Sequence, residues 1–245
     1  MARIQSTIQT GSSEFRGFYK HNKELAKELR ERQHQARHDR PQKDIDRVVN
    51  QGKCMPRDRL HKLLDPRTPF LEFSTLAANM AYDGDAPGAG CITGIGVVNG
   101  HEVIIHANDS TIKGGAWYPL TVKKIVRCLD IAIENRLPVI HLCDSAGGFL
   151  PMQSELFPDK YMAGRMFRNQ CILSKLNVKQ LALVFGHCTA GGAYIPALSD
   201  YSVIVRGTGA VFLAGPPLVK AATGEIVTAD ELGGCDLHTQ ISGTC

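Results

Sequence analysis

Strand-like and helix-like segments alternate along the chain between residues 90 and 215. Short apolar runs are each followed by longer segments in which apolar residues recur with the spacing of an amphipathic helix. The predicted strands are residues 138–143, 180–186 and 201–205, and the predicted helices are residues 119–136, residues 161–176 and a segment that begins near Thr189. Strands joined by helices run parallel with right-handed crossovers, so this order predicts an α/β layer structure.

A β-hairpin is predicted just before the first of these helices. Two β-rich runs within residues 91–109 flank Asn99-Gly100. An Asn-Gly pair between two such runs is the strongest short signal for a tight hairpin turn. The segment therefore predicts two antiparallel strands.

The first 66 residues have a more polar composition, which predicts a helical arm ahead of the α/β domain. Residues 1–16 are interpreted as a flexible tail or a short targeting segment, because they contain several Ser and Thr residues and almost no acid. Residues 17–66 form the predicted arm, which ends at the turn signal Asp65-Pro66. Residues 67–245 form the predicted domain.

Two of the predicted strand-to-helix junctions contain a glycine pair, Gly147-Gly148 and Gly191-Gly192. The carboxyl ends of parallel strands lie at one edge of a sheet, so the two loops are expected to converge. Glycine exposes backbone N–H groups, and N–H groups at a helix start lack intrahelical partners. Two such donors aimed at one thioester oxygen form an oxyanion hole, in which one donor contributes about 3 kcal/mol. The alternative is that both pairs only permit tight helix–strand packing, and the residues alone leave the two interpretations equal.

Other candidate nucleophiles and bases have weaker support. Ser145 is not part of a G-x-S-x-G motif, so no nucleophile elbow is predicted, and Asp144 is expected to cap the loop backbone. His187 and Cys188 are neighbours in a predicted strand, so their side chains point to opposite faces and do not form a dyad. His141 is interpreted as a core histidine.

Composition excludes several classes of protein. The net charge of +4 suits an anionic ligand but is far from the charge of a nucleic-acid-binding domain. No apolar run approaches the roughly 20 residues that a membrane helix needs. The eight cysteines include no C-x-x-C pair, which predicts free thiols in a reducing compartment, with no disulfide and no metal site. The sequence also lacks a Walker A motif and a Met-Lys dipeptide for biotin attachment.

Three segments have sequences that are highly specific to one protein family. They are KGGAWYP at 113–119, CTAGGAYIPA at 188–197 and AGPPLVKAATGE at 214–225. Further matches are LLDPRTPFLEFS at 63–74, GIGVVNGHE at 94–102 and ENRLPVIHLCDSAGG at 134–148. From about residue 17 to residue 243, the sequence resembles the β subunits of methylcrotonoyl-CoA carboxylases, within the biotin-dependent acyl-CoA carboxylase family. Only the N-terminal half of such a subunit is represented.

The resemblance implies a crotonase-like βα superhelix of the ClpP and crotonase type, which binds an acyl-CoA thioester and stabilises its enolate. It implies that Gly147 and Gly148 are oxyanion donors and that Gly191 is a further donor from the second loop. Lys113-Gly114-Gly115 lies in a predicted loop, which is either a plain surface loop or a contact for phosphate or pantetheine. The implied substrate-binding residues are Ala146, Lys113, Gly114, Gly115, Gly192 and Ala193.

The implied reaction transfers CO2 from carboxybiotin to 3-methylcrotonyl-CoA in leucine breakdown, with geranyl-CoA as the alternative substrate. Biotin is carried by the partner α subunit, which also uses ATP and bicarbonate, and the freed biotin nitrogen is the base. Implied partners are acyl-CoA, the α subunit and further β-type subunits in a hexamer, without nucleic acid or membrane insertion. Such complexes reside in the mitochondrial matrix, or in the cytoplasm of bacteria.

Two departures from the family pattern leave alternatives open. The family usually reads Asp-Ser-Gly-Gly-Ala where this chain has Ala146 first and Gly148 last, which backbone donors tolerate if Ala146 needs no positive φ. The family chain continues beyond the position of Cys245 into a C-terminal domain that supplies the biotin half-site. One alternative is therefore a truncated, non-catalytic chain that binds carboxylase subunits or acyl-CoA. Another is a stand-alone hydratase or hydrolase, against which the lack of a carboxylate at Tyr194 counts.

Overall fold

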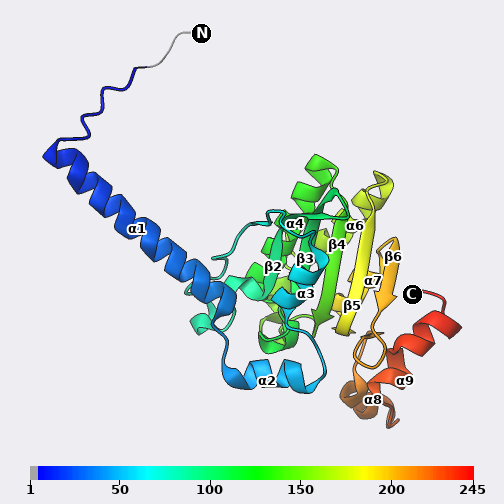
Figure 1. Cartoon of the computed structure of the whole chain (residues 1–245). Helices are drawn as coiled ribbons and strands as arrows, with labels where there is room; N and C mark the ends of the chain where they lie inside the picture. Colours follow the sequence, from blue (N-terminus) through cyan, green and yellow to red (C-terminus); the bar gives the residue numbers. More distant parts are fainter. Residues whose placement is uncertain (1–4) are drawn as a thin grey trace. The chain divides into compact units, whose positions relative to one another are not determined.

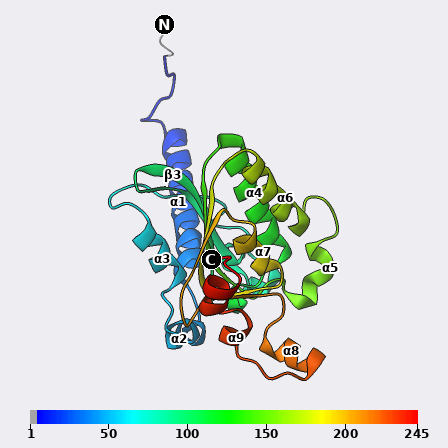
Figure 2. The ribbon, with the colours of Figure 1, turned by 90° about the vertical axis from the view of Figure 1, so that its right-hand side faces the viewer.

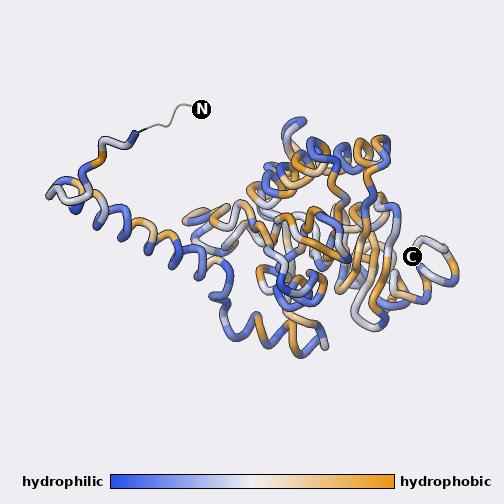
Figure 3. The backbone as a smooth tube through the Cα atoms, turned by 45° about the horizontal axis from the view of Figure 1, so that its top comes forward, coloured by the Kyte–Doolittle hydropathy of each residue, from blue (hydrophilic) through white to orange (hydrophobic). Residues whose placement is uncertain are grey.

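The computed structural model describes residues 5–245, and the first four residues of the predicted tail lie outside the described residues. Contacts group the chain into two compact units, with the boundary between Asp39 and Arg40. The first unit contains the long helix α1 (Ser13–His38), which starts where the Ser12 hydroxyl accepts the Phe15 N–H. Polar residues run along most of this helix in Figure 3, and none of its residues is buried. The long N-terminal helix predicted from the sequence is therefore present.

The second unit is built on a mixed sheet, which contains seven strands among the described residues. The strands follow the order β1-β2-β3-β4-β5-β6, and β7 pairs with β5. β1, β2 and β3 are antiparallel neighbours, whereas β3, β4, β5 and β6 run parallel. The strands are β1 (Leu71–Glu72), β2 (Cys91–Val98), β3 (His101–Asn108), β4 (Val139–Ser145), β5 (Gln180–Thr189), β6 (Tyr201–Ile204) and β7 (Ala210–Phe212).

Helices cover both faces of this sheet, as Figures 1 and 2 show. On one face, α4 and α6 pack together over a core that includes Trp117, Ile125 and Leu173. On the other face, α3 brings the fully buried Leu60 against β3 and β4, and burial of one such side chain contributes about 2 kcal/mol. The helices are α2 (Gln42–Asn50), α3 (Pro56–Leu63), α4 (Pro119–Asn135), α5 (Gln153–Leu156), α6 (Ala163–Lys175), α7 (Gly191–Ala197), α8 (Pro216–Thr223) and α9 (Ala229–Gly233). No helix of the described chain is long and apolar enough to cross a membrane.

Several predicted elements are confirmed, and two strands are longer than predicted. The hairpin turns at Asn99-Gly100, where both residues have positive φ, as the tight Asn-Gly turn requires. β4 and β5 run on to Ser145 and Thr189, because Ser145 pairs with Cys188 beyond a register shift. Residues that were expected in loops therefore belong to strand ends.

Residues 40–66 pack with the sheet, whereas the sequence-based division lies after residue 66. Besides the apolar contacts of Leu60, ion pairs hold this segment to the sheet: Arg40 pairs with Asp109, and Lys53 and Arg59 both pair with Asp144. These partners lie at the ends of β3 and β4. The polar composition that suggested a separate arm thus reflects ion pairs made with the body of the domain.

Two histidines are buried side by side in the centre of the sheet. His106 and His141 are register partners on β3 and β4, both are fully buried, and their Nδ1 atoms lie 3.1 Å apart. His141 is thus confirmed as a core histidine. Burial lowers the pKa of His141 to about 4. Burial, together with the neighbouring His141, lowers the pKa of His106 well below its usual value.

We expect this pair to make the fold sensitive to acid. The unfolded chain protonates these histidines below about pH 6.5, whereas His141 in the fold stays neutral until about pH 4. Stability is therefore fully retained above pH 6.5 and falls towards pH 4, by on the order of 3 kcal/mol for His141. Urea denaturation of the protein and of His141→Gln between pH 7 and pH 4 measures this, with His101→Gln, at an exposed position, as the control. If the free energy of unfolding of His141→Gln fell with pH as steeply as that of the unmodified protein, the expectation would be contradicted.

Candidate active site

Three loops meet at the carboxyl ends of β3, β4 and β5. The Ala146 N–H donates to the Gly114 carbonyl at 3.0 Å, which joins the loop after β4 to the loop after β3. A Cβ on Gly147 would lie 2.7 Å from the Thr189 carbonyl oxygen, so the loop after β5 touches the loop after β4 without any side chain between them. The predicted convergence of the two glycine pairs is confirmed, and the η3 turn (Lys113–Gly115) joins them.

The backbone N–H groups of these loops differ in whether they have partners. The Gly147 N–H donates to the Ser145 hydroxyl at 3.1 Å. Among the described residues, no acceptor is found for the N–H groups of Gly148, Gly191 and Gly192. The donors that face a ligand without competition are therefore Gly148 in one loop and the start of α7 in the other. The donor role of Gly147 stays a prediction, and its N–H is engaged within the loop.

The loop conformations are those that the glycine pattern requires. Gly147 has φ +84°, and Ala146 is not among the residues with positive φ, so its replacement of the usual glycine is tolerated. Ala190 has φ 50° and ψ −115°, an unfavourable conformation for a residue with a Cβ. This turn allows α7 to begin at Gly191, directly after β5.

Trp117 supports both glycine loops, and sequence reasoning assigned it no role. Its backbone N–H donates to the Gly147 carbonyl at 2.8 Å, and its backbone carbonyl accepts the Phe149 N–H at 2.9 Å. A Cβ on Gly191 would lie 3.0 Å from the indole ring, which is almost completely buried. The segment KGGAWYP therefore holds the two loops at their present separation.

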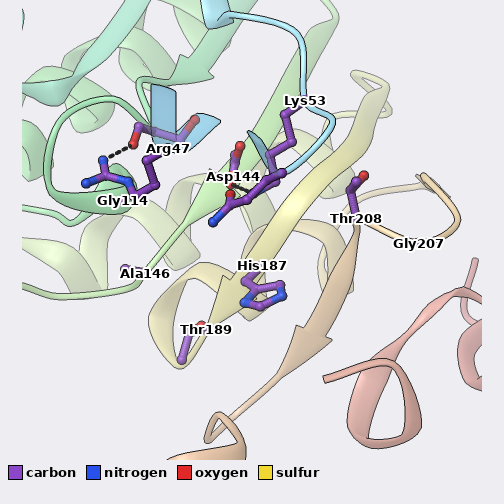
Figure 4. Close-up of a pocket in the computed structure, with 11 residues that line it drawn as sticks. Arg47, Lys53, Gly114, Asp144, Ala146, His187, Thr189, Gly207 and Thr208 are labelled. Atoms are coloured by element: carbon purple, nitrogen blue, oxygen red, sulfur yellow. Dashed lines mark hydrogen bonds and ion pairs between the residues drawn. The ribbon is translucent and has the colours of Figure 1, made fainter. Parts of the chain in front are cut away.

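A polar cavity of about 530 Å³ opens beside these loops. Gly114, Ala146 and Thr189 form the side that belongs to the three loops, and Arg47 and Lys53 approach from the segment of α2 (Figure 4). The Arg47 guanidinium donates to the Ser110 carbonyl at 3.0 Å, which holds it at the rim. The lining residues are Arg47, Gln51, Lys53, Ser110, Gly114, Asp144, Ala146, His187, Thr189, Gly207 and Thr208.

Asp144 is the acidic residue of the cavity wall, and two cations hold it. Its carboxylate oxygens lie 3.0 Å from Lys53 Nζ and 3.0 Å from Arg59 Nη2. The prediction that Asp144 caps the loop backbone is wrong, because among the described residues no backbone N–H donates to its carboxylate, which bonds to these cations instead. A Cβ on Gly186 would collide with Asp144 Oδ1, so the glycine on β5 leaves the space for this ion pair. Within this group of three charged side chains, Lys53 and Asp144 line the cavity, whereas Arg59 is buried behind them.

His187 points into the cavity from β5, while its neighbour Cys188 is fully buried, so the two do face opposite sides of the sheet (Figure 4). Burial, with the nearby Lys53 as the second cause, lowers the pKa of His187. The ring is therefore mainly neutral at pH 7 and offers one donor and one acceptor.

The remaining predicted site residues fall into two groups. Gly115 packs on the backbone of residues 144 and 145, Gly192 packs on Ser145, chiefly on its side chain, and Ala193 is buried in α7. Lys113, in contrast, points its Nζ to Asp85 at 3.0 Å, and both side chains are about half exposed. The described residues contain no group of three or more His, Cys, Asp or Glu side chains that would hold a metal ion.

Comparison with known proteins identifies the family. Residues 47–245 match the family model of the carboxyl transferase domain. The chain belongs to this family. A biotin-dependent 3-methylcrotonyl-coenzyme A carboxylase beta1 subunit from Mycobacterium tuberculosis is 57% identical over 197 residues, 80% of this chain and 37% of the relative. A mitochondrial methylcrotonoyl-CoA carboxylase beta chain from Dictyostelium discoideum is 48% identical over 241 residues, 98% of this chain and 41% of the relative.

A solved structure supports the same assignment. The beta subunit of geranyl-CoA carboxylase from P. aeruginosa is similar with a TM-score of 0.78 and 38% identity, over 99% of this chain and 44% of that one. The mixed α/β fold is therefore that of carboxyltransferase subunits, and the resemblance seen in the sequence is confirmed. This carboxyl transferase chain spans about two fifths of the length of the curated relatives it matches.

Proposed function

We propose that the chain provides the acyl-CoA half of a carboxyltransferase site that moves CO2 from carboxybiotin to 3-methylcrotonyl-CoA. The unpartnered N–H groups of Gly148, Gly191 and Gly192, at the meeting point of two glycine loops, carry the proposal. The higher identity to the methylcrotonyl-CoA enzymes than to the geranyl-CoA enzyme favours the smaller substrate. The larger unit is then a crotonase-like domain, which the parallel strands and their glycine loops support.

The chain's own contribution is to stabilise the charge that grows on the thioester oxygen when the substrate loses a proton. N–H donors from the loop after β4 and from the start of α7 approach that oxygen from two sides. The positive end of the α7 dipole and the glycine backbone favour a negative charge there. One such donor typically changes the rate by about 10²-fold.

The polar cavity suits the body of coenzyme A. Arg47 and Lys53 bring two cationic side chains to the cavity wall, where they can bind phosphates, although Arg47 also pairs with Asp44 at 2.7 Å and Lys53 with Asp144 at 3.0 Å. His187, Thr189 and Thr208 add neutral hydrogen-bonding groups for the pantetheine amides. Gly114, Ala146 and Thr189 line the cavity and are close in sequence to the proposed donors, so we propose that the thioester end of a bound ligand extends from the cavity towards Gly148 and the start of α7.

In the proposed reaction the base comes from another chain rather than from Asp144 or Tyr194, and His187 is assigned to hydrogen bonding. Asp144 is held between two cations, and the Tyr194 ring lies tilted against Phe167 with ring centroids 4.9 Å apart. Biotin carried by an α subunit supplies CO2 and the base, and that subunit uses ATP and bicarbonate. We assign no residue of this chain to biotin, and the proposed partners are the α subunit and further β-type chains in a hexamer. The proposed compartment is the mitochondrial matrix or the cytoplasm of a bacterium, and the mitochondrial beta chain of Dictyostelium discoideum supports the first.

We expect the isolated chain to bind 3-methylcrotonyl-CoA without carboxylating it. The donors and the cavity are present in this chain, whereas the resemblance assigns the biotin half-site to a second domain. Calorimetric titration measures the binding, and 14C-bicarbonate fixation with α subunit and ATP measures turnover. Turnover by this chain with only the α subunit would contradict the proposal that the acyl-CoA and biotin half-sites lie in different domains. Failure to bind acyl-CoA, with CoA and geranyl-CoA also tested, would contradict the proposed function itself.

A further inference from the structure

Ser145 lies where the three loops of the site meet. It is the last residue of β4 and is 1% exposed. Its hydroxyl donates to the Gly115 carbonyl at 3.0 Å and accepts the Gly147 N–H at 3.1 Å. One side chain therefore ties the loop after β3 to the loop after β4.

The loop after β5 also packs on this side chain. A Cβ on Gly192 would lie 3.2 Å from both Cβ and Oγ of Ser145, so the start of α7 lies directly on Ser145. The spacing between the Gly148 N–H and the N–H groups of α7 thus depends on the position of Ser145. With its proton directed to Gly115, the hydroxyl is also unavailable as a nucleophile.

The Ser145 hydroxyl selects which N–H groups remain free. It engages the Gly147 N–H and fixes Gly147 at φ +84°, while the next N–H, that of Gly148, has no acceptor among the described residues. Without the hydroxyl, the Gly147 N–H and the Gly115 carbonyl would both be buried without partners. The loop would then turn to satisfy them, because a buried unpaired polar group costs about 1–3 kcal/mol.

We propose that Ser145 is a positioning residue, whose hydroxyl directs the Gly148 N–H, in place of the Gly147 N–H, towards the thioester oxygen. The inference rests on the proposed function, since it concerns the same bound acyl-CoA. It assigns no chemical step to Ser145. The hydroxyl acts through the backbone geometry of residues 147 and 148.

The test measures polarisation of the bound thioester carbonyl by isotope-edited infrared spectroscopy with [1-13C]3-methylcrotonyl-CoA. The unmodified full chain is expected to lower the carbonyl stretching frequency, because donors polarise the C=O bond. In Ser145→Ala, acyl-CoA affinity should stay within about threefold while most of this frequency shift is lost. In a complex that also contains the C-terminal domain of a β subunit of this family and the α subunit, kcat should fall by about 10²-fold at a nearly unchanged KM.

Two further variants keep the result decisive. Ser145→Cys has a slightly larger side chain and keeps a weaker donor and acceptor, so an intermediate shift is expected even if Ser145→Ala folds poorly. Ser202→Ala is the control. It removes a single serine-to-backbone bond, from Ser202 Oγ on β6 to the Pro196 carbonyl in α7 at 2.8 Å, whereas Ser145→Ala removes two, and it should leave the shift intact. A full frequency shift in both Ser145 variants would overturn the positioning role. Absence of binding by the unmodified chain would instead overturn the proposed function, and the inference with it.

Discussion

Replacing Gly147 by valine is expected to reduce carboxylation by the completed enzyme at least about 10²-fold. Gly147 has φ +84°, and a Cβ at this position would lie 2.7 Å from the Thr189 carbonyl oxygen and 3.6 Å from the Ala190 Cβ. A branched side chain would therefore separate the loop after β4 from the loop after β5. The two sets of N–H donors would then no longer reach one oxygen.

Gly100→Val is the matched control for this substitution. Gly100 also has positive φ, at +76°, but a Cβ there would meet no atom within 4 Å. Both variants share the backbone cost of a side chain in this conformation, about 1–2 kcal/mol, so the difference between them isolates the contact with Thr189. Steady-state kinetics and acyl-CoA titration of both variants measure the effect. Near-normal turnover by Gly147→Val would show that the convergence of the loops is not needed for catalysis.

The periodicity of the sequence predicted the central elements because their pattern is local. The Asn99-Gly100 turn and the apolar stripe of α4 depend on neighbouring residues only, and both are found where expected. The ends of β4 and β5 were predicted too early. Ser145 and Thr189 carry small polar side chains typical of loops, yet tertiary pairing extends the strands through them.

The glycine pairs were sufficient to predict where the site lies, but not which groups are free. That the Gly147 N–H bonds to Ser145 depends on a hydroxyl orientation that no sequence pattern specifies. Arg47 and Lys53 were missed as cavity residues, because Lys53 meets Asp144 across 91 residues of sequence. A single sequence contains no signal for such a pair. The small residue Gly186 opposite Asp144 was the available indication of a close approach.

Asp144→Asn is expected to destabilise the fold by about 3–5 kcal/mol. The substitution preserves size and removes the negative charge that two buried cations share. The Lys53 and Arg59 side chains are only 10% and 2% exposed, and the Asp144 side chain is 4% exposed. Because the Arg59 guanidinium is almost completely buried, water cannot solvate it in place of the lost carboxylate. Urea denaturation at pH 7 measures the change in the free energy of unfolding.

The comparison that decides this prediction uses an ion pair of the same kind in a different environment. Asp236→Asn removes the carboxylate of the exposed Arg206–Asp236 pair and should leave the Tm nearly unchanged, because water solvates the arginine that remains. Adding Lys53→Met to Asp144→Asn should recover part of the lost stability, since one of the two uncompensated charges is then gone. Equal Tm values for Asp144→Asn and Asp236→Asn would contradict the buried ion group. The segment of α2 and α3 would then be held to the sheet by apolar contacts such as those of Leu60 rather than by Asp144.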